Sequence, residues 1–276
     1  MKEGPVVIGG VGGSGTRLFA TILKDLGFYL GADLNAAFDN LWFTLLFKRQ
    51  ELWPPETHKK ELTELLQIFC AAMIDGFSPN DSDLERIKSL AKNARPQHSE
   101  AWLSERVESM LALNKGALNC PWGFKEPNSH IFLPVLIESL ESLKYVHVIR
   151  HGVDMAYSEN QNQLAFWGKR VLNRPIDTDS RKDSLAYWCE VHRRVEKLGA
   201  KLGDRFMLLN YDDFCRSPSK WLEALLHFLN KDKSELPIDQ LNSYLKATTL
   251  NRRKGKDLSI FAADDLSYVE SLGFEI

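Results

Sequence analysis

The sequence predicts an α/β protein with a mostly parallel sheet flanked by helices, and three observations predict it. Residues 5–9 form an apolar segment that leads into a glycine-rich loop and then into an amphipathic segment. Residues 145–149 are the clearest strand of the chain, because they are rich in β-branched types and contain no breaker. Beyond them, strand-like and helix-like segments alternate, which is typical of a parallel sheet covered by helices on both faces.

Each element has its own local signal. Residues 16–26 predict a helix that Gly27 ends, and residues 28–30 predict a short second strand. Helical periodicity recurs between prolines in four segments, at residues 41–49, 61–77, 82–93 and 100–114. The remaining predictions are strands at 122–125 and 206–210, and helices at 131–140, 183–202 and 218–229. We expect one domain over residues 1–276 with a helical insertion over about 35–115, because no repeat or long linker divides the chain.

The composition narrows the class of protein. The chain has 276 residues, 44% hydrophobic and 26% charged, which is ordinary for a globular protein. Its net charge of −2 gives no general attraction to nucleic acid or to anionic membranes, so an anion site must be local. Four separated cysteines show no metal-ligand spacing and predict a reduced setting without a metal. No apolar run approaches the length of a membrane span and no leader is evident, so we expect a cytoplasmic protein without a membrane segment. The sequence gives no indication of oligomeric state.

The glycine-rich loop predicts a phosphate site. Glycines let successive backbone N–H groups converge on an anion, and the helix that follows adds the positive end of its dipole. Gly10 and Gly15 have the spacing found in kinase and ATPase loops, but Thr16 stands where those loops carry a lysine. The loop is therefore predicted to hold a phosphate without the usual groups for transferring one.

Two further segments carry candidate anion ligands. Arg150 follows the strand at 145–149, and Ser158 lies eight residues later on the helix predicted there, so both could contact one anion. A local cap and a helix-bonded serine are the alternative. Arg252, Arg253 and Lys254 form a second basic cluster, for which a solvated charge run is the ordinary interpretation. Together with the loop, these residues suggest a ligand with phosphates at two separate places.

Four motifs follow one another along the chain. The first is Ser14-Gly15-Thr16 after the first strand. The others are Arg150 with Asp154 and Ser158, Tyr211-Asp212-Asp213-Phe214 after a strand, and Arg253-Lys254-Gly255 near the C-terminus. In identity, spacing and order they resemble the motifs of the sulfotransferases that use 3′-phosphoadenosine 5′-phosphosulfate (PAPS). They span nearly the whole chain, and the set is more specific than any one motif.

The resemblance implies a fold like that of P-loop-containing nucleotide hydrolases. It implies transfer of a sulfuryl group from PAPS to a hydroxyl or amine of a small-molecule, glycan or lipid acceptor. The product of the donor would be adenosine 3′,5′-bisphosphate (PAP), and no metal would be required. The loop would bind the 5′-phosphosulfate, and this set comprises Gly12, Gly13, Ser14, Gly15, Thr16 and Arg17. The 3′-phosphate would be bound by a second set, Arg150, Ser158, Arg252, Arg253, Lys254 and Gly255.

The chain departs from the family pattern at catalytic positions. Gly13 replaces a lysine common in cytosolic members, so Arg17 or Lys125 must supply the cation. His151-Gly152 replaces Asp-Pro, and the catalytic histidine of the cytosolic branch is not evident. The acceptor therefore cannot be inherited from that branch.

Lys125 and Glu126 end a predicted strand, so we expect them at the ligand edge of the sheet. Transfer to an alcohol needs a base and a group that stabilises charge on the leaving oxygen, and we assign these roles to Glu126 and Lys125. His130 is a rival base. Asp33 and Asp39 are two more, although each could instead cap a helix that begins near Asn35.

Two other functions remain open from the sequence. A P-loop nucleotide or small-molecule kinase would use ATP and magnesium, and the absent loop lysine counts against it. A non-catalytic nucleotide-binding module would keep the fold and lose the chemistry, which Gly13 in place of the lysine leaves possible.

Overall fold

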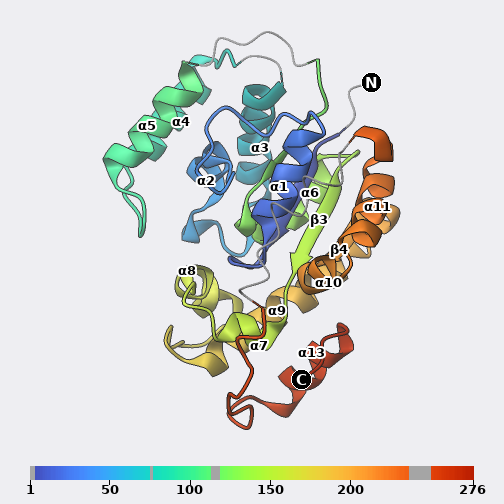
Figure 1. The fold of residues 1–276 in the computed structure, drawn as a ribbon. Coiled ribbons are helices and arrows are strands. Elements are labelled where there is room, and N and C mark those ends of the chain that lie inside the picture. Colours follow the sequence, from blue (N-terminus) through green and yellow to red (C-terminus); the bar gives the residue numbers. More distant parts are fainter. Residues whose placement is uncertain (1–3, 75–76, 113–118, 236–249) are drawn as a thin grey trace. The chain divides into compact units, whose positions relative to one another are not determined.

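The computed structural model describes residues 4–74, 77–112, 119–235 and 250–276 (Figure 1). Its four strands are β1 (Val6–Gly10), β2 (Gly123–Lys125), β3 (Lys144–Ile149) and β4 (Phe206–Asn210). They form one sheet in the order β2-β1-β3-β4. β1 runs parallel to β2, with Val7 opposite Phe124, and β3 runs parallel to β4, with Val148 opposite Leu209. The predicted class, a mostly parallel sheet flanked by helices, is confirmed.

The chain forms two compact units. The N-terminal unit comprises Met1–Ile8 and Ala20–Lys144, and the C-terminal unit comprises Gly9–Phe19 and Tyr145–Ile276. The glycine-rich loop thus belongs to the C-terminal unit. The expectation of a single domain with an insertion stays a prediction.

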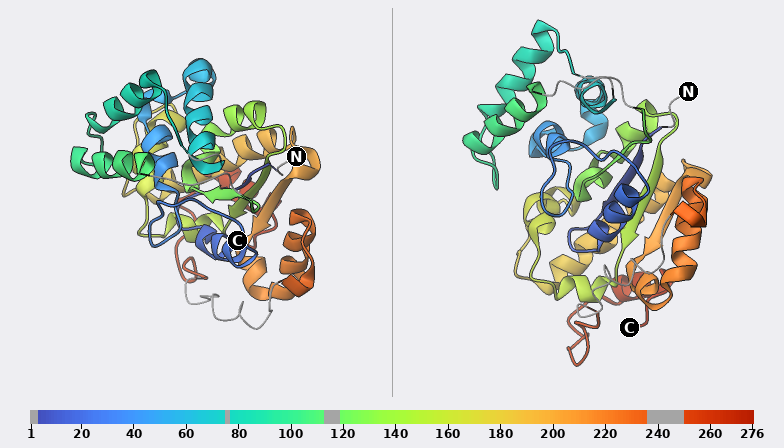
Figure 2. Two further views of the ribbon diagram at one scale, coloured as in Figure 1. Left: turned by 90° about the horizontal axis from the view of Figure 1, so that it is seen from above. Right: turned by 45° about the horizontal axis from the view of Figure 1, so that its top comes forward.

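The N-terminal unit is mostly helical. Helix α1 (Thr16–Asp25) begins in the C-terminal unit and continues into this one. The other helices are α2 (Leu41–Phe47), α3 (Lys59–Ile74), α4 (Asp81–Ala91), α5 (Glu100–Leu111) and α6 (Leu133–Ser139), with short 3-10 helices η1 (Gln50–Leu52), η2 (Pro55–His58) and η3 (Pro127–Phe132). Figures 1 and 2 show α4 and α5 side by side. The core contains a cluster of aromatic rings in which Phe43 stacks on Phe47 at 4.4 Å and on Phe124 at 5.0 Å.

The C-terminal unit is built around β3, β4 and a long buried helix, α9 (Arg181–Gly199). The others are α7 (Gly152–Ala156), α8 (Asn162–Val171), α10 (Tyr211–Arg216), α11 (Pro218–Leu229) and α13 (Ala263–Ser271), with 3-10 helices η4 (Gly203–Arg205) and η5 (Lys233–Glu235). α7 and α8 both pack against α9, and α10 follows β4 directly. This arrangement places α7 at the carboxyl end of β3, where a parallel sheet presents its ligand-binding loops.

Several predicted elements differ from the structure. Residues 28–30 form only a single bridge from Tyr29 to Trp122, because Gly31 turns the chain with a φ of 119° and the Asn40 amide donates to the Leu30 carbonyl at 3.0 Å. Predicted helix 131–140 begins as the 3-10 helix η3. Helices α8, α10 and α13 were not predicted. Residues 75–76 and 113–114 of the predicted helices lie outside the described residues.

Within the part of the chain that the structure describes, no helix combines the length and the apolar composition that crossing a membrane requires.

Candidate active site

The loop between β1 and α1 has a backbone that glycine makes possible. Gly13 and Gly15 have φ values of 96° and 97°, in the left-handed region. A Cβ on Gly15 would lie 2.2 Å from the Tyr211 ring, so no side chain fits there. Ser14 is 1% exposed, and its buried hydroxyl has no hydrogen-bond partner among the described residues. A buried polar group of this kind favours a ligand at the loop.

Arg150 reaches the loop from the end of β3. Its side chain is buried, and one guanidinium nitrogen donates to the Gly13 carbonyl at 3.3 Å. The guanidinium carbon lies 5.3 Å from the centre of the Tyr211 ring. The structure therefore brings together two of the predicted anion-binding groups, although they are 137 residues apart in sequence.

Asp154 on α7 holds the C-terminal basic segment in place. Its carboxylate accepts hydrogen bonds from the backbone N–H groups of Asn251 at 2.7 Å and Arg253 at 2.9 Å. The guanidinium of Arg253 lies 3.4 Å from the same carboxylate. Arg253, which we expected to bind phosphate, is thus already paired with a buried acid.

Arg252 differs from Arg253 in its partners. One of its guanidinium nitrogens is buried and has no hydrogen-bond partner in the described part of the chain. The pKa of Arg252 is lowered below its ordinary value, mainly by burial and to a smaller extent by the Arg150 guanidinium. The two guanidinium groups thus repel each other, and Arg150 contacts the loop, so an anion bound between them would relieve this repulsion.

The other predicted donor-binding residues lie at three separate places in the chain. Ser158 does not lie on a helix as predicted, because α7 ends at Ala156, and its hydroxyl accepts from the Asn160 N–H at 3.3 Å. Lys254 and Gly255 lie in an exposed turn, where Gly255 has a φ of 75°. Arg17 lies in the first turn of α1 and is exposed.

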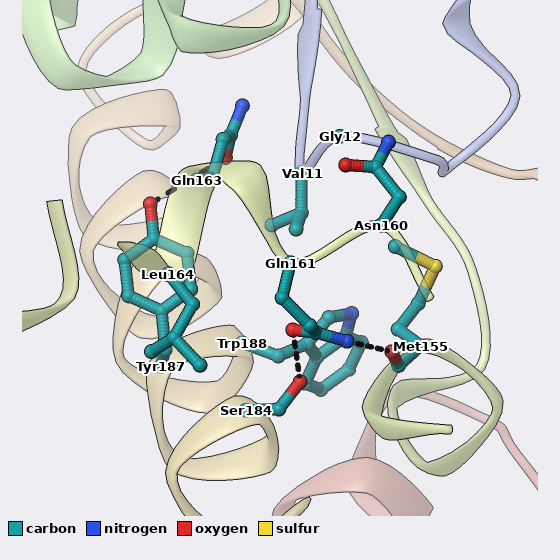
Figure 3. Close-up of a pocket in the computed structure, with 10 residues that line it drawn as sticks. All are labelled: Val11, Gly12, Met155, Asn160, Gln161, Gln163, Leu164, Ser184, Tyr187 and Trp188. Atoms are coloured by element: carbon teal, nitrogen blue, oxygen red, sulfur yellow. Dashed lines mark hydrogen bonds between the residues drawn. The ribbon is translucent and has the colours of Figure 1, made fainter. Parts of the chain in front are cut away.

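A small cavity lies against the loop (Figure 3). Its volume is about 10 Å³, enough for one water molecule and too little for a nucleotide. The Gln163 amide donates to the Gly10 carbonyl at 3.2 Å, and the Gln161 side chain bonds Met155 and Ser184. Gln163 thus ties α8 to the end of β1, where the loop begins, and Gln161 ties the start of α8 to α7 and α9. Sequence reasoning missed them, because no motif marks them.

Lys125 and Glu126 follow one another at the end of β2 in the N-terminal unit, and both are buried. The Lys125 ammonium pairs with the Asp39 carboxylate and also donates to the Ala37 carbonyl at 3.2 Å. The Glu126 carboxylate accepts hydrogen bonds from the backbone N–H of Asn128 at 2.5 Å and from its side-chain amide at 2.8 Å. Burial, first, and the Asp39 charge, second, raise the pKa of Glu126 from 4.5 to about 7.

Glu126, Asp33 and Asp39 all line one open cleft of about 530 Å³ in the N-terminal unit. Asp33 is paired with Arg106 at 2.9 Å and accepts from the Ser109 hydroxyl at 2.5 Å. The helix expected near Asn35 begins at Leu41, and its cap is Asn40, so neither aspartate caps it.

His130 is 1% exposed within η3 and is not among the residues that line this cleft. Among the described residues, no group of three or more His, Cys, Asp and Glu side chains is placed to hold a metal ion.

Comparisons with known proteins agree on a family. The model of the sulfotransferase family matches residues 5–235. A search of curated proteins found no match. Among solved structures, the sulfotransferase domain of the Synechococcus PCC 7002 olefin synthase is 17% identical, with a TM-score of 0.52, and the similarity covers 100% of this chain and 96% of that one.

Two further structures are similar over the whole of this chain. A sulfotransferase from Alicyclobacillus acidocaldarius is 12% identical with a TM-score of 0.47, and 98% of its chain is covered. One from Mycobacterium avium is 12% identical with a TM-score of 0.48, and 78% of its chain is covered. The match to the family model spans most of the sequence, and the fold of the Synechococcus domain agrees with it. This chain belongs to the sulfotransferase family.

Proposed function

We propose that this protein transfers a sulfuryl group from PAPS to a hydroxyl or amine of a small-molecule, glycan or lipid acceptor and leaves PAP. The observation that carries the proposal is the grouping of the glycine-rich loop with Arg150 and Arg252 in the C-terminal unit. A nucleotide with phosphates at two positions fits this grouping, because the loop and the arginines offer two separate sets of anion ligands.

The donor-binding roles follow from where each residue lies in the C-terminal unit. The backbone of Gly12 to Thr16, with the buried hydroxyl of Ser14, would bind the 5′-phosphosulfate. Arg150 and Arg252 would bind the 3′-phosphate, with Ser158 as a further donor. We assign Arg253 a different role from Arg252, since its pairing with Asp154 holds the segment in place.

The remaining roles concern the proton and the leaving group. When bound, PAPS supplies an activated sulfuryl group. Glu126 is our choice of base, because it lines the open cleft and because a pKa of about 7 leaves much of it ionised at neutral pH. Lys125 is paired with Asp39, so it fixes that carboxylate beside Glu126. Arg17 is therefore our choice of cation for the leaving oxygen, since it lies on the loop's own helix.

Calorimetric titration with PAP tests the donor site. We expect PAP to bind without magnesium, and Arg150→Met and Arg252→Met to weaken binding by about tenfold or more, as loss of a charged hydrogen bond implies. Arg216→Met is the matched control, because this arginine is 58% exposed and forms a surface ion pair with Asp213, three residues away, at 3.0 Å. Equal effects of all three changes would refute the assignment.

The same titration separates the alternatives. ATP with magnesium binding more tightly than PAP would favour the kinase. PAP binding without sulfuryl transfer from radiolabelled PAPS to any of a panel of hydroxyl and amine acceptors would favour a non-catalytic module.

A further inference from the structure

The open cleft of the N-terminal unit is large enough for a small organic molecule. Its volume of about 530 Å³ lies within the range of ligand pockets in proteins. Its walls come from the segment before α2, from α2 and Lys48 just after it, from the segment before α5 and α5 itself, and from Glu126 after β2. Only three lining residues are apolar, namely Leu34, Leu41 and Trp102, and the other nine carry polar or charged groups.

The charges in the cleft are largely compensated within the protein. Asp33 is paired with Arg106 at 2.9 Å, and Asp39 is paired with Lys125. Lys48 donates to the Gln97 amide at 3.1 Å. Burial lowers the pKa of His98 to about 4, so this ring is neutral at pH 7. A strongly charged ligand would find no excess of opposite charge here and would have to separate an existing pair.

The cleft also lacks an open aromatic slot among its described lining residues. The Trp102 indole is in contact with the His98 ring, at a centroid distance of 4.3 Å, and with the Arg106 guanidinium, at 5.1 Å. Leu41 is only 8% exposed. A flat apolar molecule would therefore meet mainly polar groups, which lose hydration on its binding without gaining partners.

We propose that this cleft is the acceptor site and that it takes an uncharged molecule rich in hydroxyl groups, such as a sugar. The inference rests on the proposed sulfotransferase function. Hydroxyl groups both donate and accept hydrogen bonds, so they can match a wall that offers carboxylate oxygens, amides and an ammonium together. His98 adds a buried ring nitrogen, Nδ1, that has no hydrogen-bond partner within the described part of the chain.

The chemistry of the step fits an alcohol acceptor. The acceptor hydroxyl would give its proton to the Glu126 carboxylate as its oxygen forms a bond to sulfur. The bond from sulfur to the phosphate oxygen of the donor would break, and PAP would leave with that electron pair. No oxidant or reductant is needed.

Binding measurements on the full chain test the acceptor class. Maltose serves as the uncharged hydroxyl-rich probe, gluconate as a negatively charged polyol, glucosamine as a positively charged sugar, and 4-nitrophenol as an aromatic one. Saturation-transfer NMR with titration gives each affinity, in the presence of saturating PAP and without it. We expect maltose to bind most tightly.

Lys48→Met removes an ammonium from the cleft wall and is expected to weaken maltose binding by about tenfold. Lys60→Met makes the same change on an exposed position of α3 outside the cleft and is expected to have no effect.

The outcomes distinguish the inference from the function on which it rests. If PAP binds, three results would overturn the acceptor class and leave the sulfotransferase assignment standing. They are a preference for 4-nitrophenol or a charged probe, no binding of maltose, and equal effects of the two lysine changes. Failure of PAP to bind would overturn the assignment itself, and with it the role of the cleft as an acceptor site.

Discussion

Replacing Glu126 by glutamine is expected to stabilise the protein at high pH and to abolish most of its activity. In the folded state the pKa of Glu126 is raised from 4.5 to about 7, mainly by burial. The folded protein thus holds this proton more tightly than the unfolded chain does, and the free energy of unfolding falls as pH rises from about 4.5 to above 7. That difference in pKa corresponds to a penalty of about 3 kcal/mol once the group is ionised.

Glutamine keeps the shape of the side chain and removes the buried charge. Subtracting about 1 kcal/mol for a weakened hydrogen bond to Asn128 leaves a gain of about 2 kcal/mol at pH 9. Near pH 4 the penalty is absent, so only the loss of about 1 kcal/mol from the hydrogen bond remains. Loss of a general base lowers the turnover number by about 10²- to 10⁴-fold. In the unchanged protein, the turnover number is expected to fall as pH drops through about 7.

Urea unfolding at pH 4, 7 and 9, together with transfer assays, measures both effects. Glu108→Gln, at an exposed position of α5, is the matched control and is expected to change neither. A variant that is less stable than the unchanged protein at pH 9 would refute the argument from burial. A variant with normal turnover would show that Glu126 is not the base.

Three further predictions concern the C-terminal unit and the metal. Asp154→Asn removes the charge that pairs with Arg253 and is expected to weaken PAP binding by about tenfold in calorimetry. Asp264→Asn, on the exposed start of α13, is the control and is expected to leave PAP binding unchanged. Equal PAP binding by both variants would contradict the anchoring role of Asp154. Gly15→Ala places a methyl group against the Tyr211 ring at a residue with a φ of 97°. The change is expected to lower the free energy of unfolding by about 1–3 kcal/mol and to abolish PAP binding. A normal melting temperature would contradict the loop geometry. Sulfuryl transfer is expected to be unchanged after treatment with EDTA, and an activity that returns only with added magnesium would contradict metal independence.

The parts of the fold that the sequence predicts well have strong local signals. Strand β4 and helix α11 have the predicted bounds, because an apolar run or a proline start marks each. Helix α10 was missed since its motif reads as the end of a strand, whereas Asn210 caps a new helix by accepting from the N–H groups of Asp212 and Asp213. Residues 28–30 are predicted as a strand but form only one bridge, from Tyr29 to Trp122. The turn at Gly31 that ends the pairing depends on the folded chain around it, and the apolar pattern does not indicate it.

The residues of the candidate site also fall into those that the sequence predicted and those whose pairing it could not predict. Spacing alone predicted the loop and Arg150, which the structure places in contact. It could not distinguish Arg252 from Arg253, because the difference comes from Asp154, which is 99 residues from Arg253. The pairing of Lys125 with Asp39, 86 residues away, was equally hidden. Pairings between distant residues depend on how the chain folds, and no local pattern records them.

A crystal structure of the complex with PAP would test the proposed donor site. We predict that the 5′-phosphate lies on the backbone of the loop at Gly12 to Thr16 and that the 3′-phosphate lies between the guanidinium groups of Arg150 and Arg252. A PAP molecule bound elsewhere, or one whose 3′-phosphate contacts neither arginine, would contradict it.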